Sequence, residues 1–191
     1  YSPAVTHQPL ANLEDDKVAS PLNWFTQILK EKKLPEKAAY TYVIGADAWK
    51  KWNEFPVQTG KQQEWFLQAG KKIGKSVKEQ AEVSFVYDPE NPVSSHGAES
   101  LFASQAGVGS ISQPRSGYRD DVVTFLSEPV PEDTEMEGKI KVRLFVKSDA
   151  EDTAFSAKLM EVFENGECVN IRGSITTLAY RNQNPHRGTY T

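Results

Sequence analysis

The sequence is short of cysteine and of long apolar runs. Its one cysteine, Cys168, cannot form an internal disulfide, so the fold must depend on an apolar core and on hydrogen-bonded ladders. Such cysteine usage permits a reducing compartment, so the cytoplasm is slightly favoured, but the sequence leaves the compartment open. No apolar run approaches the roughly 20 residues that a membrane-spanning helix needs, and no basic and then apolar leader opens the chain. The expectation is a soluble protein without a membrane partner.

Positive charge is also scarce. The formal net charge is −4, and no extended cluster of lysine and arginine is present. This argues against nucleic acid as a partner, because phosphates demand a basic surface. The lysines at positions 71, 72, 75 and 78 share one stretch, but neither interleaved aromatic residues nor a phosphate-binding glycine pattern accompany them. We interpret this stretch as a solvated loop and not as an anion site.

Metal binding finds little support in the sequence. Three acidic pairs, Asp120-Asp121, Glu132-Asp133 and Glu151-Asp152, fall in expected turns. Oxygen clusters of this sort hold calcium only when several loops converge. Aspartate in turns also caps its own backbone and keeps sheet edges soluble. The turn role is the simpler interpretation, so we expect no metal and no cofactor.

Alternation of apolar and polar residues is the strongest signal in the second half of the chain. One apolar face is expected of residues 139–146, whose alternate positions are Ile140, Val142, Leu144 and Val146. Residues 154–159 repeat the period of two with Phe155, Ala157 and Leu159. Between two strand-like runs, Asn165-Gly166 predicts a type I′ hairpin. These features predict antiparallel pairing within a β-sandwich.

The first part of the chain has a different character. Residues 15–33 have the pattern of a helix, with Val18, Leu22, Phe25 and Leu29 on one apolar stripe. Because Pro21 suits only a first turn, we expect the helix itself to start with Ser20 as its N-cap. Residues 30–33 place three lysines at the expected last turn, and Pro35 stops the helix. Residues 40–44 then predict a short strand. A helix followed by a strand is typical of the edge of an α/β sheet.

Four stretches have distinctive sequence motifs: Tyr87-Asp88-Pro89-Glu90-Asn91-Pro92-Val93, Arg119-Asp120-Asp121-Val122, Val142-Arg143-Leu144-Phe145-Val146-Lys147-Ser148 and Asp152-Thr153-Ala154-Phe155-Ser156-Ala157-Lys158-Leu159. In this order, they resemble motifs of the C-terminal β-domain of the X-prolyl dipeptidyl peptidase and cocaine esterase group of serine hydrolases. Further similarity to that group covers residues 42–45, 55–56 and 65–67.

The resemblance implies a mainly β fold with two parts. Residues 1–55 would be the last helix and strand of an α/β-hydrolase domain, and residues 56–191 would be a jelly-roll β-sandwich, incomplete at its C-terminus. Family members continue past the position of Thr191, so a jelly roll that stopped there would have exposed strand edges. We therefore expect the rest of the hydrolase chain, a second subunit or a further copy of this chain as a partner.

The family's activity is hydrolysis of small acyl esters or of peptide bonds after proline, and it needs a serine in a G-x-S-x-G turn. This chain has no such turn; Gly107-Val108-Gly109-Ser110-Ile111 lacks the last glycine and the strand-to-helix context. The chain alone is therefore not expected to run the triad mechanism. By resemblance, His7 is the one candidate catalytic residue, as general base and acid. His96 and His186 are expected to be exposed to solvent.

Leu101 and Phe102 are the candidate substrate-binding residues. In esterases of this group, an apolar pair in the loop ahead of the "R-D-D-V" strand reaches the active site and helps to shape the acyl pocket. The resemblance gives Leu101-Phe102 that role, and buried apolar side chains of this kind discriminate acyl groups. Packing in the core of the β-domain is an equally good interpretation of the pair.

Two other functions stay open from the sequence. Trp49, Trp52 and Trp65 could form an aromatic platform for sugar rings, which would make the chain a carbohydrate-binding jelly roll, although packing is the favoured role for these residues. The chain could also be a structural or interaction module that binds no ligand.

Overall fold

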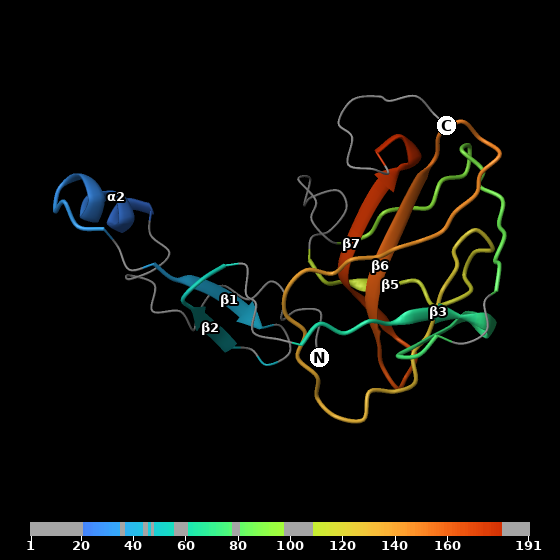
Figure 1. Cartoon of the computed structure of the whole chain (residues 1–191), viewed down its shortest axis with the longest axis horizontal. Helices are drawn as coiled ribbons and strands as arrows, with labels where there is room; N and C mark the ends of the chain where they lie inside the picture. Colours follow the sequence, from blue (N-terminus) through green and yellow to red (C-terminus); the bar gives the residue numbers. More distant parts are fainter. Residues whose placement is uncertain are drawn as a thin grey trace. The chain divides into compact units, whose positions relative to one another are not determined.

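The computed structural model describes residues 21–34, 37–43, 46, 48–55, 61–77, 81–97 and 109–180. The chain divides into two units: residues 1–63 with 132–139, and residues 64–131 with 140–191. Strands outnumber helices in the described part, which holds one α-helix and sheets whose strands are antiparallel (Figure 1). The prediction of a mainly β fold is confirmed. Within these described ranges, no helix has the length and apolarity to cross a membrane.

In the first unit, the helix α2 (Pro21–Leu29) begins with proline, whose missing N–H costs nothing in a first turn. The helix ends before the lysines that were expected in its last turn, so that detail of the prediction is wrong. Lys32 instead adopts a left-handed φ of 57°, and the Lys33 N–H donates to the carbonyl of Gln27 at 3.0 Å. The helix thus ends at Leu29, and the backbone turns into the left-handed region three residues later, at Lys32.

The first unit also contains an antiparallel pair, β1 (Ala39–Val43) and β2 (Ala48–Trp52). Strand β1 confirms the predicted strand, while its partner β2 was not predicted. The pairing sets Tyr42 opposite Trp49, with ring centroids 5.4 Å apart. On the other face, the indole N–H of Trp52 donates to Thr41 Oγ1 at 2.8 Å. The two tryptophans of β2 therefore lie on opposite faces of the pair, because their spacing of three residues is odd.

An acidic segment of residues 132–139 joins this unit through Lys50 of β2. The Lys50 ammonium contacts the carboxylates of Glu135 and Glu137, the second at 3.2 Å. Hydrogen bonding to these two carboxylates raises the pKa of Lys50. The same ammonium lies 5.5 Å from the centre of the Trp52 ring. One lysine thus links the strand pair to a segment more than eighty residues away in sequence.

The second unit starts with a short antiparallel pair, β3 (Phe66–Gln68) and β4 (Lys72–Gly74), joined by the 3₁₀ turn η2 (Ala69–Lys71). Gly70 and Lys71 both have positive φ, at 72° and 59°. The interpretation of the lysine stretch after β3 as only a loop is wrong, because residues 72–74 form β4. A lysine in a left-handed conformation is uncommon, and no sequence pattern indicated it. Leu126 lies beside this pair: the Ile73 N–H donates to the Leu126 carbonyl at 2.9 Å, and the Leu126 N–H donates to the Lys71 carbonyl at 3.0 Å.

The main sheet has three strands in the order β5-β7-β6. The long strands β6 (Ala154–Val162) and β7 (Cys168–Thr177) form a ribbon, and the two-residue strand β5 (Ser112–Gln113) lies on the other edge of β7 (Figure 1). The pairing shifts between Leu159 and Met160, where β7 has one extra residue, a β-bulge. The 3₁₀ turn η3 (Leu178–Tyr180) follows β7. Cys168 and Val169 of β7 are the buried apolar residues here, at 3% and 4% exposed.

The predicted hairpin between β6 and β7 is confirmed, but its turn differs from type I′. Gly166 has a φ of 80°, whereas Asn165 is not among the described residues with positive φ. The Gly166 N–H donates to Phe163 at 2.8 Å, and the Phe163 N–H donates to Glu167 at 2.9 Å. Asn165 Oδ1 also accepts from the Glu167 N–H at 2.9 Å. This is the pattern of a three-residue hairpin loop that ends in a left-handed glycine.

Residues 139–146 form no ladder in the structure, so the strand predicted there is wrong. Their alternating pattern is present, yet the side chains of Ile140 and Val142 are more than half exposed, at 52% and 58%. Alternation indicates which side chains share a face, but it does not specify a partner edge. The alternating pattern therefore predicted a strand, but a strand forms only where a neighbouring strand edge pairs with it.

Candidate functional site

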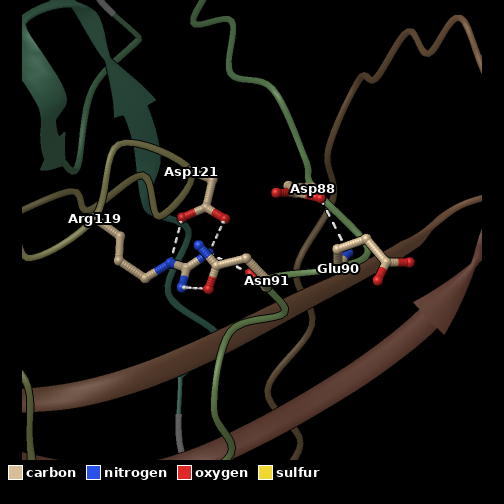
Figure 2. A network of polar contacts seen from close by, with 5 residues as sticks. All are labelled: Asp88, Glu90, Asn91, Arg119 and Asp121. Carbon is tan, nitrogen blue, oxygen red and sulfur yellow. Dashed lines mark hydrogen bonds and ion pairs between the residues drawn. The ribbon is translucent and has the colours of Figure 1, made fainter.

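A polar clamp centred on Arg119 joins two distant parts of the second unit (Figure 2). Arg119 Nε and Nη2 donate to the two carboxylate oxygens of Asp121, each at 2.6 Å. Arg119 Nη1 donates to Asn91 Oδ1 at 3.1 Å, and Nη2 donates to the Asn91 main-chain carbonyl at 2.6 Å. The planar guanidinium suits this paired geometry, which a lysine ammonium could not reproduce.

The turn that presents Asn91 is itself fixed by Asp88. Asp88 Oδ1 accepts from the Glu90 N–H at 3.0 Å, and the Asp88 carbonyl accepts from the Asn91 N–H at 3.1 Å. An aspartate that binds the backbone two residues ahead makes a turn by its own side chain. The stretch Tyr87-Asp88-Pro89-Glu90-Asn91 and the stretch Arg119-Asp120-Asp121 are thus brought together, as Figure 2 shows.

The clamp is partly shielded from water. The side chains of Arg119 and Asp121 are 22% and 10% exposed. Hydrogen bonding to Arg119 lowers the pKa of Asp121, and the same bond raises the pKa of Arg119. A shallow hollow of about 280 Å³ adjoins the pair and is lined by Val86, Asp88, Asn91, Arg119, Asp120 and Asp121. The described residues that line the hollow include no serine, histidine or cysteine.

A second polar cluster lies against the main sheet and is centred on Asn170, which is 1% exposed. Asn170 Oδ1 accepts from the Ile111 N–H at 3.0 Å and from Gln113 Nε2 at 2.9 Å. Asn170 Nδ2 donates to the Gly109 carbonyl at 3.0 Å. Both ends of the side-chain amide are used, so its orientation is fixed.

Gln113 and Lys158 extend this cluster across all three strands. Gln113 is 7% exposed, and its Nε2 also donates to the His96 carbonyl at 3.2 Å. Lys158 Nζ, from β6, donates to Gln113 Oε1 at 2.8 Å. Desolvation lowers the pKa of Lys158. Sequence analysis missed these residues; the only signal was a polar asparagine inside the apolar start of β7, Cys168-Val169-Asn170-Ile171.

The residues predicted for catalysis and substrate binding lie outside the described part of the chain. His7, Leu101 and Phe102 all belong to stretches of which the structure gives no description, as does His186. His96 is exposed, as expected. Ser110 is 7% exposed, and it precedes the two-residue strand β5 and not a helix, so its surroundings differ from those of a nucleophile turn.

The other sequence candidates can be compared with the geometry. Among the described residues, no set of three or more histidine, cysteine, aspartate or glutamate side chains is arranged to hold a metal ion. Trp49 and Trp52 lie on opposite faces of their strand pair, so they do not form one flat platform for a sugar ring. Of the lysine stretch, Lys75 lies 5.2 Å from the centre of the Trp65 ring and Lys72 pairs with Glu128 at 3.4 Å, while Lys78 lies outside the described residues.

The sequence of the chain matches a known domain. Residues 30–189 match the family described as the X-Pro dipeptidyl-peptidase C-terminal non-catalytic domain. The chain belongs to this family. Cocaine esterase of Rhodococcus sp. (strain MB1 Bresler) is 30% identical over 151 residues, which are 73% of this chain and 26% of the esterase. The chain thus spans about a quarter of that relative's length. No solved structure gives a significant match.

The description of the matched family makes residues 30–189 a non-catalytic C-terminal domain. The Arg119 clamp and the Asn170 cluster both lie inside residues 30–189. So do β1 and β2, since the match begins nine residues before Ala39.

Proposed function

We propose that this domain shapes the substrate pocket of a serine hydrolase that cleaves small acyl esters or peptide bonds after proline. The single observation that carries the proposal is the match of residues 30–189 to a non-catalytic domain of this family. The cocaine esterase named as a relative supports an ester substrate for the whole enzyme. Leu101 and Phe102 would supply apolar contacts to the acyl or peptidyl group.

The described structure bears on this proposal only through the residues that flank the pair in sequence. In sequence, Leu101 and Phe102 lie between Gly97 and Gly109. The carbonyl of His96, next to Gly97, accepts a hydrogen bond from Gln113, and the Gly109 carbonyl accepts one from Asn170. Gln113 and Asn170 are also hydrogen-bonded to each other on the main sheet. A pair carried between two fixed ends can be presented to a neighbouring catalytic domain. The sandwich would serve as the rigid support for this presentation.

Three further points remain predictions. His7 would be the histidine of the catalytic triad, and it lies ahead of the matched residues. Residues 1–55 would be the end of an α/β-hydrolase domain, and residues 56–191 would form a jelly roll. A second subunit or a second copy of this chain would cover strand edges, which light scattering after size-exclusion chromatography tests directly.

The test of the pocket role uses the full-length hydrolase that contains this chain. Leu101→Ala and Phe102→Ala are compared with the wild type on p-nitrophenyl esters of increasing acyl size and on a proline-linked nitroanilide. We expect the ratio of kcat/KM between small and large acyl groups to change by roughly tenfold or more. Phe145→Ala is the matched control, because Phe145 is 97% exposed. Unchanged ratios in both pocket variants would refute the proposal.

A further inference from the structure

The hairpin between β6 and β7 contains the one asparagine of the chain that is followed by glycine, in the pair Asn165-Gly166. An asparagine side chain can react with the backbone nitrogen of the next residue. Glycine allows this reaction best, because it has no Cβ to obstruct the approach. Asn165 is exposed, so water reaches the pair. Asn170, in contrast, is buried, and Asn91 precedes a proline, whose nitrogen carries no hydrogen.

The reaction needs water and no other partner. The Gly166 nitrogen loses its proton to solvent and forms a bond to Asn165 Cγ. The bond from Cγ to Nδ2 breaks, and Nδ2 takes up a proton from solvent and leaves as ammonia, so that a succinimide ring remains. Water then adds to one of the two ring carbonyls and opens the ring, which leaves aspartate or isoaspartate at position 165.

In the closed hairpin, both reacting groups are already hydrogen-bonded. The Gly166 N–H donates to the Phe163 carbonyl at 2.8 Å. Asn165 Oδ1 accepts from the Glu167 N–H at 2.9 Å, and Asn165 Nδ2 donates to Glu167 Oε2 at 3.0 Å. The nitrogen that attacks must give up the first bond, and the side-chain amide must give up the other two before it can turn towards that nitrogen. The closed loop therefore opposes the reaction at both groups.

Neither product can restore the native loop. Both products lack Asn165 Nδ2, which is the donor to Glu167. Isoaspartate adds one carbon atom to the backbone between positions 165 and 166, within a loop whose ends are joined by the hydrogen bond from the Phe163 N–H to the Glu167 carbonyl. Aspartate instead places a second carboxylate beside that of Glu167, and like charges repel. The chemical change therefore favours the open hairpin.

We propose that Asn165 is a self-modification site, at which opening of the hairpin leads to a permanent covalent change. The Gly166 nitrogen attacks the Asn165 amide in the open state, so the rate of conversion follows the population of open hairpins. The substrate of this chemistry is the side-chain amide of the protein itself. The inference is independent of the ester or peptide that a hydrolase containing this domain would cleave.

The test ages the full-length protein that contains this chain at mildly alkaline pH, both folded and unfolded in urea. Peptide mapping by mass spectrometry measures aspartate and isoaspartate at each asparagine. In the folded protein, Asn165 should convert before Asn91 and Asn170. Unfolding should accelerate its conversion by roughly tenfold or more, because the hydrogen bonds of the loop are lost. Asn165→Gln should stay unmodified, since its longer side chain forms the larger ring far more slowly.

Glu167→Ala tests the restraint directly, because it removes the acceptor of Asn165 Nδ2. It should speed conversion in the folded protein by roughly threefold or more and leave the rate in urea unchanged. Glu164→Ala is the matched control, since Glu164 is exposed in the same loop and its side chain takes no part in the three hydrogen bonds of the reacting groups.

Two results would overturn the inference. Wild-type protein that converts equally fast with and without urea, or a Glu167→Ala variant that ages like Glu164→Ala, would show that the loop does not restrain the reaction. Conversion of Asn91 or Asn170 ahead of Asn165 would show that position 165 is not the reactive site.

Discussion

Asn91 accepts two hydrogen bonds from Arg119, one at its side-chain Oδ1 and one at its main-chain carbonyl, although the residues are 28 positions apart. The contact joins the turn at residues 88–91 to the stretch that begins at Arg119. Both stretches have sequence motifs that resemble those of the family. A guanidinium can donate to two acceptors at once, so the arginine and the Asx turn act together in this contact.

Arg119→Lys should therefore destabilise the second unit although it conserves charge. A lysine ammonium cannot donate to Asp121 and to both Asn91 oxygens from one plane. We expect the thermal midpoint of Arg119→Lys to lie below that of Lys141→Arg. Lys141→Arg is the control, because it makes the reverse substitution at an exposed site. Circular dichroism melts would measure the difference, and equal midpoints for Arg119→Lys and the wild type would contradict the clamp.

The low pKa of Asp121 predicts how the clamp responds to acid. Because hydrogen bonding to Arg119 lowers this pKa in the folded state, the carboxylate stabilises the fold at neutral pH and down to the ordinary aspartate value of about 4. That contribution is lost as the pH falls from this value through the lower folded-state pKa. Asp121→Asn should be less stable than wild type at pH 7, with a difference that shrinks below pH 4 in urea titrations.

Asp120→Asn serves as the control for this pH dependence, because Asp120 is its exposed neighbour. Its stability difference from the wild type should stay small at neutral pH. A gap between wild type and Asp121→Asn that stayed constant, or grew, towards pH 2 would mean that the carboxylate is not held by Arg119.

Two glycines with similar left-handed backbones should respond differently to alanine. Gly117 has a φ of 81° with nothing within 4 Å of an added Cβ, so Gly117→Ala should cost only the backbone strain of about 1–2 kcal/mol. Gly97→Ala adds steric overlap with Asn170 and Ile111, so it should cost about 1–3 kcal/mol more. Urea unfolding measures the loss in the free energy of unfolding for each variant. Equal losses would show that the space beside Gly97 is open.

Cys168 should be inert in the folded protein. It is 3% exposed, and its thiol donates weakly to the Gly166 carbonyl at 3.7 Å. We expect a thiol reagent such as dithiobis-nitrobenzoate to react slowly under native conditions and rapidly in concentrated guanidinium chloride. Equally fast reaction in both conditions would show that the start of β7 is not in the core.

Local patterns in the sequence predicted those parts of the fold whose partners are near in sequence. The alternation of Phe155, Ala157 and Leu159 and the pair Asn165-Gly166 predicted β6 and its hairpin with β7, because a short turn leaves one pairing available. Residues 139–146 show the same alternation and yet form no ladder, since a partner edge must come from elsewhere. An alternating pattern therefore predicts a strand more reliably when a hairpin motif lies next to it in the sequence.

The candidate sites were less predictable. The resemblance pointed to the stretch around Arg119, but the bond to Asn91 depends on a separation of 28 residues. Asn170 gave no signal beyond its polarity in an apolar strand, because its partners Gly109 and Gln113 lie 61 and 57 positions away. Long-range hydrogen bonds become visible only when the strands are placed.

The central proposal is that this domain shapes a substrate pocket while the nucleophile comes from elsewhere in the hydrolase. The most direct test incubates the isolated chain with p-nitrophenyl acetate and a proline-linked nitroanilide, and in parallel with a fluorophosphonate that labels activated serines. The account predicts neither turnover above the buffer rate nor labelling, because no described serine lies in a nucleophile turn. Stoichiometric labelling of one serine together with turnover would contradict it.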